Sequence, residues 1–258
     1  MCAASPGFPA GEDGKVSQCV ILAGGLGTRM GPLTAHRPKA LLPVNGRPFV
    51  DHQLRWLAAH GVEEAVLCIG HLGGQLRAHV GDGSAHGLRV RYVDEGERLR
   101  GTAGALRLAL EEGALAESFL LTYGDSFLPV DTASVAQAFR ESGAPALMTV
   151  LENRGRWGES NAIATRGRVV LYDKGRRDPR AAEMEHIDYG LLAFRRSVVE
   201  ARVSPSYPAD LADLLHALSL AGELAAFEVT TRFYEVGSPQ GLADLERFLL
   251  VLQASSGG

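Results

Sequence analysis

The chain has few cysteines and no long apolar run. Its 258 residues include three cysteines, Cys2, Cys19 and Cys68, which show no C-x-x-C spacing. Cys19 and Cys68 lie in apolar stretches, where a buried free thiol is the usual state. This usage predicts a reducing, cytoplasmic location. Because no apolar run approaches the roughly 20 residues that span a bilayer, we expect no membrane partner.

The chain also lacks a strong excess of charge of either sign. Its 26 basic and 30 acidic residues give a formal net charge of −4, which argues against a nucleic-acid coat or a basic membrane-binding surface. The composition, 46% hydrophobic and 22% charged, is ordinary for a globular enzyme. We therefore expect small-molecule partners and no nucleic acid, while a homo-oligomer stays open.

We expect a single folded domain over residues 17–252 between two flexible tails. Residues 1–16 are rich in Ala, Gly and Pro and lack the basic start and apolar stretch of a signal peptide. Residues 253–258 read QASSGG and look equally unstructured.

Strand-like and helix-like patterns alternate over the first half of the chain. This alternation predicts an α/β fold with a Rossmann-like, mostly parallel sheet and helices on both faces. Two later strand-like runs flank a charged loop and predict a small antiparallel lid over about residues 153–195. The expected strands are 18–23, 65–70, 88–93, 119–122, 146–151, 161–174 and 186–194, and the expected helices are 49–60, 74–80, 102–110, 133–141, 210–220 and 240–252.

A glycine-rich loop follows the first expected strand and predicts a phosphate site. Gly24, Gly25 and Gly27 let backbone N–H groups approach a phosphate closely, because glycine has no Cβ. Arg29 and Lys39 add positive charge at the same place. The spacing fits neither the G-x-G-x-x-G dinucleotide fingerprint nor the G-x-x-x-x-G-K-[ST] P-loop. A polyphosphate is the expected ligand.

The stretch LAGGLGTRMGPLTAHRPKALLPVNGRP at 22–48 resembles the signature of the sugar-nucleotide pyrophosphorylases, the sugar-1-phosphate nucleotidyltransferases. Further segments are similar: GTAGAL (101–106), YGDSFL (123–128), YDK (172–174) and YEVGSP (234–239). Met30 and the extra Gly31 depart from the family pattern. In motif style the chain is closest to the heptose/mannose-1-phosphate guanylyltransferase branch. The resemblance implies a GT-A-like nucleotidyltransferase fold.

The resemblance implies a magnesium site. Asp125, in the Gly-Asp pair that ends an expected strand, matches the family's metal ligand. Glu235 stands where the family has a second carboxylate, usually Asp. Magnesium takes oxygen ligands and is commonly held by one or two carboxylates plus substrate phosphates. Alone, Asp125 would more often cap a turn or helix.

The resemblance also implies where the substrates bind. Arg29 would cover the leaving pyrophosphate, Lys39 the transferring phosphoryl group and Lys174 the sugar phosphate. Glu95 or Glu97 could accept from the two adjacent donors of guanine, which favours GTP. The expected nucleotide-binding residues are Leu22, Ala23, Gly24, Gly25, Gly27, Thr28, Glu95, Glu97, Gly101 and Thr102. The expected sugar-phosphate residues are Gly158, Asn161, Asp173, Lys174, Glu185 and Tyr189.

These features predict magnesium-dependent transfer of a nucleoside monophosphate from an NTP to a sugar 1-phosphate. Three alternatives stay open. The nucleotide could be a pyrimidine NTP, the acceptor could be a non-sugar phosphate such as phosphocholine or a polyol phosphate, or the domain could bind nucleotide-sugar without turnover.

Overall fold

A computed structural model of the chain describes residues 16–256 apart from residues 26, 28–30, 32, 97, 99 and 207. The strands are β1 (Gln18–Leu22), β2 (Pro43–Val44), β3 (Arg47–Pro48), β4 (Glu64–Ile69), β5 (Arg89–Asp94), β6 (Ser118–Tyr123), β7 (Ser126–Phe127), β8 (Ala146–Glu152), β9 (Ala162–Thr165), β10 (Arg168–Tyr172), β11 (His186–Arg195), β12 (Leu224–Val229) and β13 (Tyr234–Glu235). The α-helices are α1 (Phe49–Ala59), α2 (Gly73–Val80), α3 (Thr102–Glu111), α4 (Thr132–Ser142), α5 (Arg196–Arg202), α6 (Leu211–Leu220) and α7 (Pro239–Ser256). The short 3₁₀ helices are η2 (Lys39–Leu41), η3 (Ser84–His86) and η4 (Pro179–Glu183).

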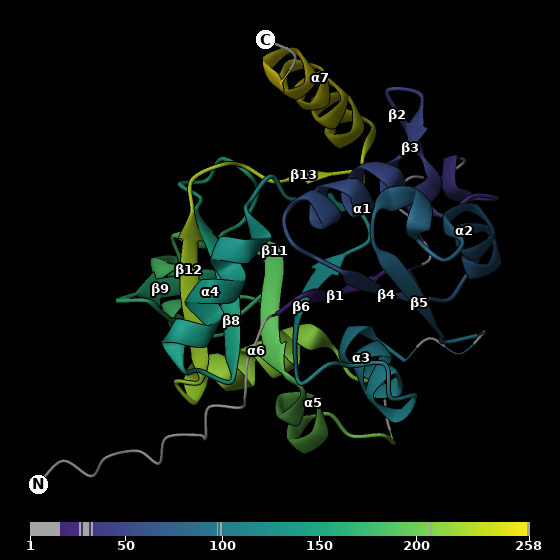
Figure 1. Cartoon of the computed structure of the whole chain (residues 1–258). Helices are drawn as coiled ribbons and strands as arrows, with labels where there is room; N and C mark the ends of the chain where they lie inside the picture. The colour runs from purple at the N-terminus through teal and green to yellow at the C-terminus, as the bar shows by residue number, and fades with distance from the viewer. Residues whose placement is uncertain are drawn as a thin grey trace, which may run out of the picture.

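One nine-stranded sheet organises the fold, in the order β5-β4-β1-β6-β11-β8-β12-β10-β9. The four strands from β5 to β6 are parallel, as the βαβ pattern predicts. Strand β11 runs antiparallel to both β6 and β8, and β9 and β10 form an antiparallel pair at the far edge. Figure 1 shows this sheet crossing the molecule from β5 to β9.

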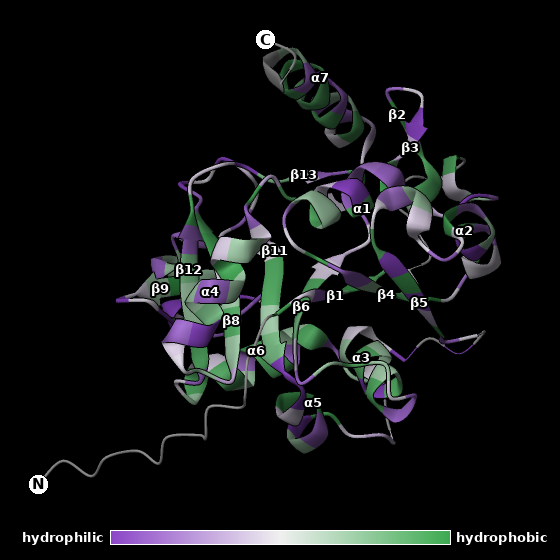
Figure 2. Cartoon of the chain, viewed as in Figure 1, coloured by the Kyte–Doolittle hydropathy of each residue, from purple (hydrophilic) through white to green (hydrophobic). Residues whose placement is uncertain are grey.

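Each face of the sheet is covered by its own set of helices. On one face α1, α2 and α4 bury side chains such as Leu54, Leu76 and Phe139 against the strands. On the other face α3, α5 and α6 do the same, with side chains such as Leu106 and Leu215. Successive strand residues point to opposite faces, so both faces need apolar side chains. Figure 2 shows hydrophobic residues along β8, β11 and β12, and hydrophilic residues on α4.

The last helix packs on a third, smaller apolar cluster. Leu245 and Leu249 of α7 contact Phe127 of β7 and Phe49 of α1 within this cluster. In Figure 1, α7 extends away from the sheet beyond β13. Among the described helices none is long and apolar enough to cross a membrane.

The expected α/β fold is confirmed, and three details differ. Strand β11 lies at the centre of the main sheet, and β9 and β10 continue that sheet as an antiparallel edge pair, so the lid over about residues 153–195 stays a prediction. Helix α7 runs to Ser256, although we expected a flexible tail from residue 253. Helix α5 and strands β2, β3, β7, β12 and β13 were also missed by the sequence analysis. Residues 1–15 of the expected N-terminal tail lie outside the described residues, whereas Val16 is already buried in the core.

Candidate active site

A cavity of about 260 Å³ lies where the carboxyl ends of β1 and β6 meet. Ligands commonly bind at this edge of a parallel sheet. The expected nucleotide-binding residues that the structure describes all line it: Leu22, Ala23, Gly24, Gly25, Gly27, Glu95, Gly101 and Thr102. Lys39 and Asp125 line it too. Thr28, Arg29 and Glu97 lie outside the described residues, so their roles stay predictions.

Lys39 and Asp125 face each other across the cavity. Lys39 Nζ donates to Asp125 Oδ2 at 3.0 Å, and the side chains are 15% and 25% exposed. Lys39 is positioned by the 3₁₀ turn η2 that follows Pro38, and Asp125 by the turn after β6. The pair therefore places one positive and one negative charge beside the glycine loop, 86 positions apart in the chain.

Glu95 forms part of the same wall, at the end of β5. Its Oε2 accepts a hydrogen bond from the backbone N–H of Arg100 at 2.9 Å. Its Oε1 lies so close to Gly24 that a Cβ added there would come within 2.6 Å. Burial raises the pKa of Glu95, and the Arg100 N–H and guanidinium partly offset this effect. A carboxylate is thus held against the phosphate loop, inside the cavity.

The segment that begins α3 is anchored to the segment that begins α6. Gly101 has a φ of 77°, and a Cβ on it would come within 2.5 Å of the Ala209 carbonyl oxygen, so glycine is required. The Thr102 hydroxyl donates to Asp210 Oδ1 at 3.0 Å and accepts from the Leu211 N–H at 2.7 Å. Thr102 therefore supports the start of α6 and makes no capping bond to its own helix.

The carboxylates near the cavity fit a magnesium ion that is held together with substrate. Strand β13 pairs with β7, which sets Glu235 opposite Ser126, and the Val236 N–H donates to the Asp125 carbonyl at 2.9 Å. Glu235 is thereby brought next to the turn between β6 and β7 that carries Asp125. The described residues contain no group of three or more His, Cys, Asp or Glu that could hold a metal. Two carboxylates plus nucleotide phosphates suit Mg²⁺.

The predicted sugar-phosphate residues lie outside the lining of this cavity. Asn161 sits where β9, β10 and β11 meet: its backbone carbonyl accepts from the Asp173 N–H, and its Oδ1 accepts from the Asp188 N–H at 2.8 Å. Lys174 follows at the end of β10 and acts electrostatically on Asp188. The structure thus brings Asn161 and Lys174 together around Asp188.

Other predicted sugar contacts have structural roles in this chain. The Asp173 carboxylate accepts backbone N–H bonds from Gly175, Arg177 and Asp178, so it fixes the loop after β10. Tyr189 is 1% exposed and its ring lies 5.9 Å from that of Phe233, which places the ring in the core, and its sugar contact stays a prediction.

Gly158 and Glu185 are both exposed, and each uses its carbonyl oxygen to accept a bond from Asn153. Their sugar contacts stay predictions.

Two residues near the site escaped the sequence analysis, although each directly precedes residues named there, Gly124-Asp125 for Tyr123 and Tyr189 for Asp188. Tyr123 lines the cavity, and Asp188 and Asp125 both act on it electrostatically. Burial raises the pKa of Asp188 to about 6, the Gly190 N–H and Lys174 oppose this shift, and the negative charge of Glu235 adds to it. Tyr123 precedes Gly124-Asp125 directly, which was the available signal. Asp188 directly precedes Tyr189, which the sequence analysis named, but only the sheet brings its side chain near Lys174 and Glu235.

The family model described as the MobA-like NTP transferase domain matches residues 19–225 of the chain. This match includes the glycine loop, Lys39, Glu95 and Asp125. It covers well over half of the 258 residues.

Two curated relatives are sugar-1-phosphate nucleotidyltransferases by name. A mannose-1-phosphate guanylyltransferase of Mycobacterium tuberculosis is 30% identical over 240 residues, which cover 88% of this chain and 64% of the relative. A glucose-1-phosphate thymidylyltransferase of Streptomyces antibioticus is 28% identical over 206 residues, which cover 78% of this chain and 56% of the relative. The chain thus spans less than two thirds of the length of these relatives.

The fold is similar to that of a solved inositol-1-phosphate CTP transferase from T. maritima. The TM-score is 0.70 at 20% sequence identity, and the alignment covers 91% of this chain and 95% of the solved one. At this identity the likeness supports the fold.

Proposed function

This chain belongs to the MobA-like NTP transferase family, and on that premise we propose that it transfers a nucleoside monophosphate from an NTP to a sugar 1-phosphate. The observation that carries the proposal is that groups suited to bind a nucleotide line a single cavity. Its wall combines the glycines of a phosphate loop, the Lys39–Asp125 pair and the Glu95 carboxylate. The named relatives transfer a nucleotide to a sugar 1-phosphate, which supports the same substrate class here.

In this reaction an oxygen of the sugar 1-phosphate attacks the α-phosphorus of the NTP in line, and pyrophosphate leaves. The attacking phosphate is already anionic at neutral pH, so no general base is needed. Two anions must be brought together, and the protein contributes positioning and neutralisation of charge. Such a site needs cations and backbone N–H donors, and it needs no nucleophilic side chain.

The residues of this chain divide that work. The N–H groups of the loop at Gly24, Gly25 and Gly27 would hold phosphate oxygens. Lys39 would break its ion pair with Asp125 and contact the transferring phosphoryl group. Lys174 would hold the sugar phosphate near Asn161. Arg29, outside the described residues, would cover the leaving pyrophosphate.

Asp125 and Glu235 would hold a magnesium ion. When bound, the ion would neutralise phosphate charge. Asp125 contacts Lys39 at 3.0 Å, and this ion pair would open as Asp125 binds the magnesium ion.

We further propose that GTP is the preferred nucleotide. Glu95 has one carboxylate oxygen on the Arg100 N–H and the other over Gly24, and it lies in the cavity beside Gly101. Guanine presents two adjacent donors that one carboxylate can accept, whereas uracil and thymine present one donor between two acceptors. An unpaired buried polar group costs about 1–3 kcal/mol, which is a tenfold to hundredfold preference.

The test is a screen of GTP, UTP, dTTP and CTP against a panel of sugar 1-phosphates, phosphocholine and a polyol phosphate, with pyrophosphate release as the readout. We expect release with GTP and a sugar 1-phosphate, with kcat/KM at least tenfold above the other nucleotides. A pyrimidine nucleotide that wins by tenfold would overturn the base assignment alone. Release only with phosphocholine or a polyol phosphate would overturn the acceptor, and nucleotide binding without any release would make the domain a binder.

A further inference from the structure

A second, smaller cavity of about 80 Å³ lies beside the start of α3, lined by Arg98, Arg100, Arg107, Ser204 and Ser206 together with Gly104 and two prolines. The active-site cavity is lined by Gly101 and Thr102 at the start of the same helix. The first turn of α3 is therefore shared by two cavities, and only one of them is explained by the transfer reaction.

The chemistry of this arginine pocket suits an oxyanion. It has guanidinium groups and serine hydroxyls, and no acidic side chain is among its described lining residues. Arg100 Nε is buried without a hydrogen-bond partner in the described part of the chain, although a buried N–H donor left unpaired is costly. The guanidinium fork matches the oxygens of a phosphate group.

Arg107 is held in place at the edge of the pocket. Its Nε donates to Glu111 at 3.0 Å and its Nη1 to the Val203 carbonyl at 3.3 Å. Arg98 is exposed. The pocket thus combines a fixed arginine, an arginine whose Nε is buried and an exposed arginine, and its volume suits a phosphate group better than a whole nucleotide.

The pocket is connected to the base-binding wall through the backbone of Arg100. The Arg100 N–H donates to Glu95 Oε2 at 2.9 Å, and the Arg100 carbonyl accepts from the Ala209 N–H at 2.9 Å. The Ala209 carbonyl in turn accepts from the N–H groups of Ala103 and Gly104. The Arg100 guanidinium also acts electrostatically on Glu95. An anion bound to Arg100 would counter that attraction.

We propose that the arginine pocket binds a phosphate group, of a small phosphorylated effector or of free phosphate or pyrophosphate, and changes the affinity of the active-site cavity for NTP. This inference concerns a site separate from the proposed transfer reaction. Coupling of two sites is reciprocal, so NTP must change the affinity of the pocket for phosphate by the same factor. Typical couplings between sites are about 5-fold to 150-fold.

The first experiment measures binding of inorganic phosphate and of pyrophosphate by calorimetry, at ionic strength held constant with KCl. Phosphate can also bind at the glycine loop. The Lys39→Ala substitution is therefore introduced to remove the part of the measured binding that takes place at that loop. We expect Arg98→Ala and Arg107→Ala each to weaken the remaining component at least tenfold. Arg91→Ala is the matched control, because Arg91 lies on β5 outside the pocket and donates to the Gly113 carbonyl.

The result that overturns the site is phosphate binding by Arg98→Ala and Arg107→Ala that equals binding by Arg91→Ala. Arg98 is exposed, so its variant stays folded even if Arg107→Ala does not. If the pocket binds pyrophosphate more tightly than phosphate, the ligand of the pocket is the reaction product. If it binds phosphate more tightly, the ligand is free phosphate or the phosphate group of another molecule.

The second experiment measures the dissociation constant of GTP with and without about 10 mM phosphate, which is tenfold above a dissociation constant of about 1 mM. We expect a shift of at least fivefold in the wild type and no shift beyond simple competition in Arg98→Ala. An equal shift in both proteins would mean that phosphate acts only in the active-site cavity, which overturns the coupling. Phosphate binding at the pocket is measured without turnover. Its result therefore tests the pocket independently of the proposed reaction.

Discussion

At the scale of single residues, the candidate active site depends on charges held at close distance without substrate. Asp125 contacts Lys39, and Glu95 contacts the Arg100 N–H and overlies Gly24. Each carboxylate is therefore balanced by a cation or by backbone donors until substrates arrive. Removing one of these groups changes a defined interaction, so point substitutions are informative here.

Asp125→Asn should lower turnover at least a hundredfold and remove the dependence on Mg²⁺, because a neutral amide is a poor ligand for a hard cation. Turnover against Mg²⁺ concentration is the measurement. Asp131→Asn is the control: Asp131 caps α4 by accepting from the N–H groups of Ala133 and Ser134, and Asn caps equally well. An unchanged Mg²⁺ requirement in Asp125→Asn would make Asp125 a structural residue.

Gly24→Ala should alter nucleotide preference, whereas Gly25→Ala should not. A Cβ at Gly24 would come within 2.6 Å of Glu95 Oε1 and push this flexible carboxylate away, while a Cβ at Gly25 meets no atom within 4 Å. Both variants alter the phosphate loop, so both can raise KM. The ratio of kcat/KM for GTP over UTP separates them, and the same ratio in both variants would contradict a role of Glu95 in reading the base.

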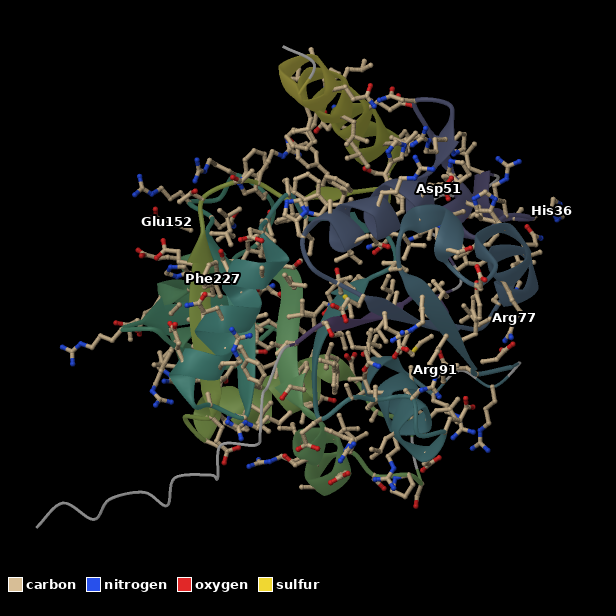
Figure 3. The ribbon with its side chains drawn as sticks, in the orientation of Figure 1. His36, Asp51, Arg77, Arg91, Glu152 and Phe227 are labelled. Atoms are coloured by element: carbon tan, nitrogen blue, oxygen red, sulfur yellow. The ribbon has the colours of Figure 1, made fainter. Side chains whose placement is uncertain are left out.

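At the scale of elements, a buried carboxylate joins three helical segments that cover one side of the sheet. Asp51 of α1 accepts at Oδ1 from His79 of α2 at 2.8 Å and from His86 of η3 at 2.9 Å. Figure 3 shows Asp51 where α1 meets the segment around α2. Burial alone would raise the pKa of Asp51, but the hydrogen bonds from His86 and His79 and their charges together hold it below the ordinary value.

This arrangement predicts an acid-sensitive contribution to stability. Because the pKa of Asp51 is lower in the folded protein than in the unfolded chain, its contribution is present above the unfolded pKa of 3.8. It is lost as the pH falls from that value through the folded pKa. Asp51→Asn should lower the free energy of unfolding at pH 7 by about 1–2 kcal/mol, the difference between charged and neutral hydrogen bonds.

Urea unfolding of the wild type and Asp51→Asn at pH 7 and below pH 3.8 measures this contribution, and the difference between the two proteins should shrink at the lower pH. Asp213→Asn is the control, because Asp213 makes only an exposed ion pair with Arg177 at 3.9 Å, and such pairs contribute about 0–1 kcal/mol. A difference that stays constant with pH would show that the charge of Asp51 adds nothing.

At the scale of the whole molecule, the sheet is packed on both faces, and two of its inner strands carry the two described cysteines. Cys19 of β1 and Cys68 of β4 are 0% exposed and belong to the clusters on opposite faces. Burial raises the pKa of both thiols far above the ordinary range. Neither thiol can react until the sheet opens, so their reactivity reports on the whole fold.

A Cys2→Ser variant, which leaves these two thiols, should react with Ellman's reagent about 10³-fold or more slowly in buffer than in 6 M guanidinium chloride. GTP with Mg²⁺ should slow the reaction further, because a ligand that binds only the folded state lowers the open population. Colour development over time is the measurement. Reaction of either thiol within seconds in buffer would mean that β1 or β4 opens locally.

Much of the candidate nucleotide-binding cavity could be predicted from the sequence, because the residues that line it are close in sequence or follow strand ends. The glycine loop directly follows β1, and Asp125 directly follows β6, so the parallel pairing of these strands was enough to bring them together. Lys39 lies in the same signature and its approach is fixed locally by Pro38 and η2. Local pattern therefore determined the α/β class, the phosphate loop and most of the cavity wall.

Only the tertiary structure decided the surroundings of the predicted sugar-phosphate residues and the arginine pocket. Strand β11 enters the middle of the sheet between β6 and β8, which buries Tyr189 and brings Asp188 toward Lys174 and Glu235. The arginine pocket likewise joins residues near 100 to residues near 205. Such contacts depend on which strand or loop becomes a neighbour. That choice is set by burying apolar surface over the whole chain, and no short stretch of sequence carries it.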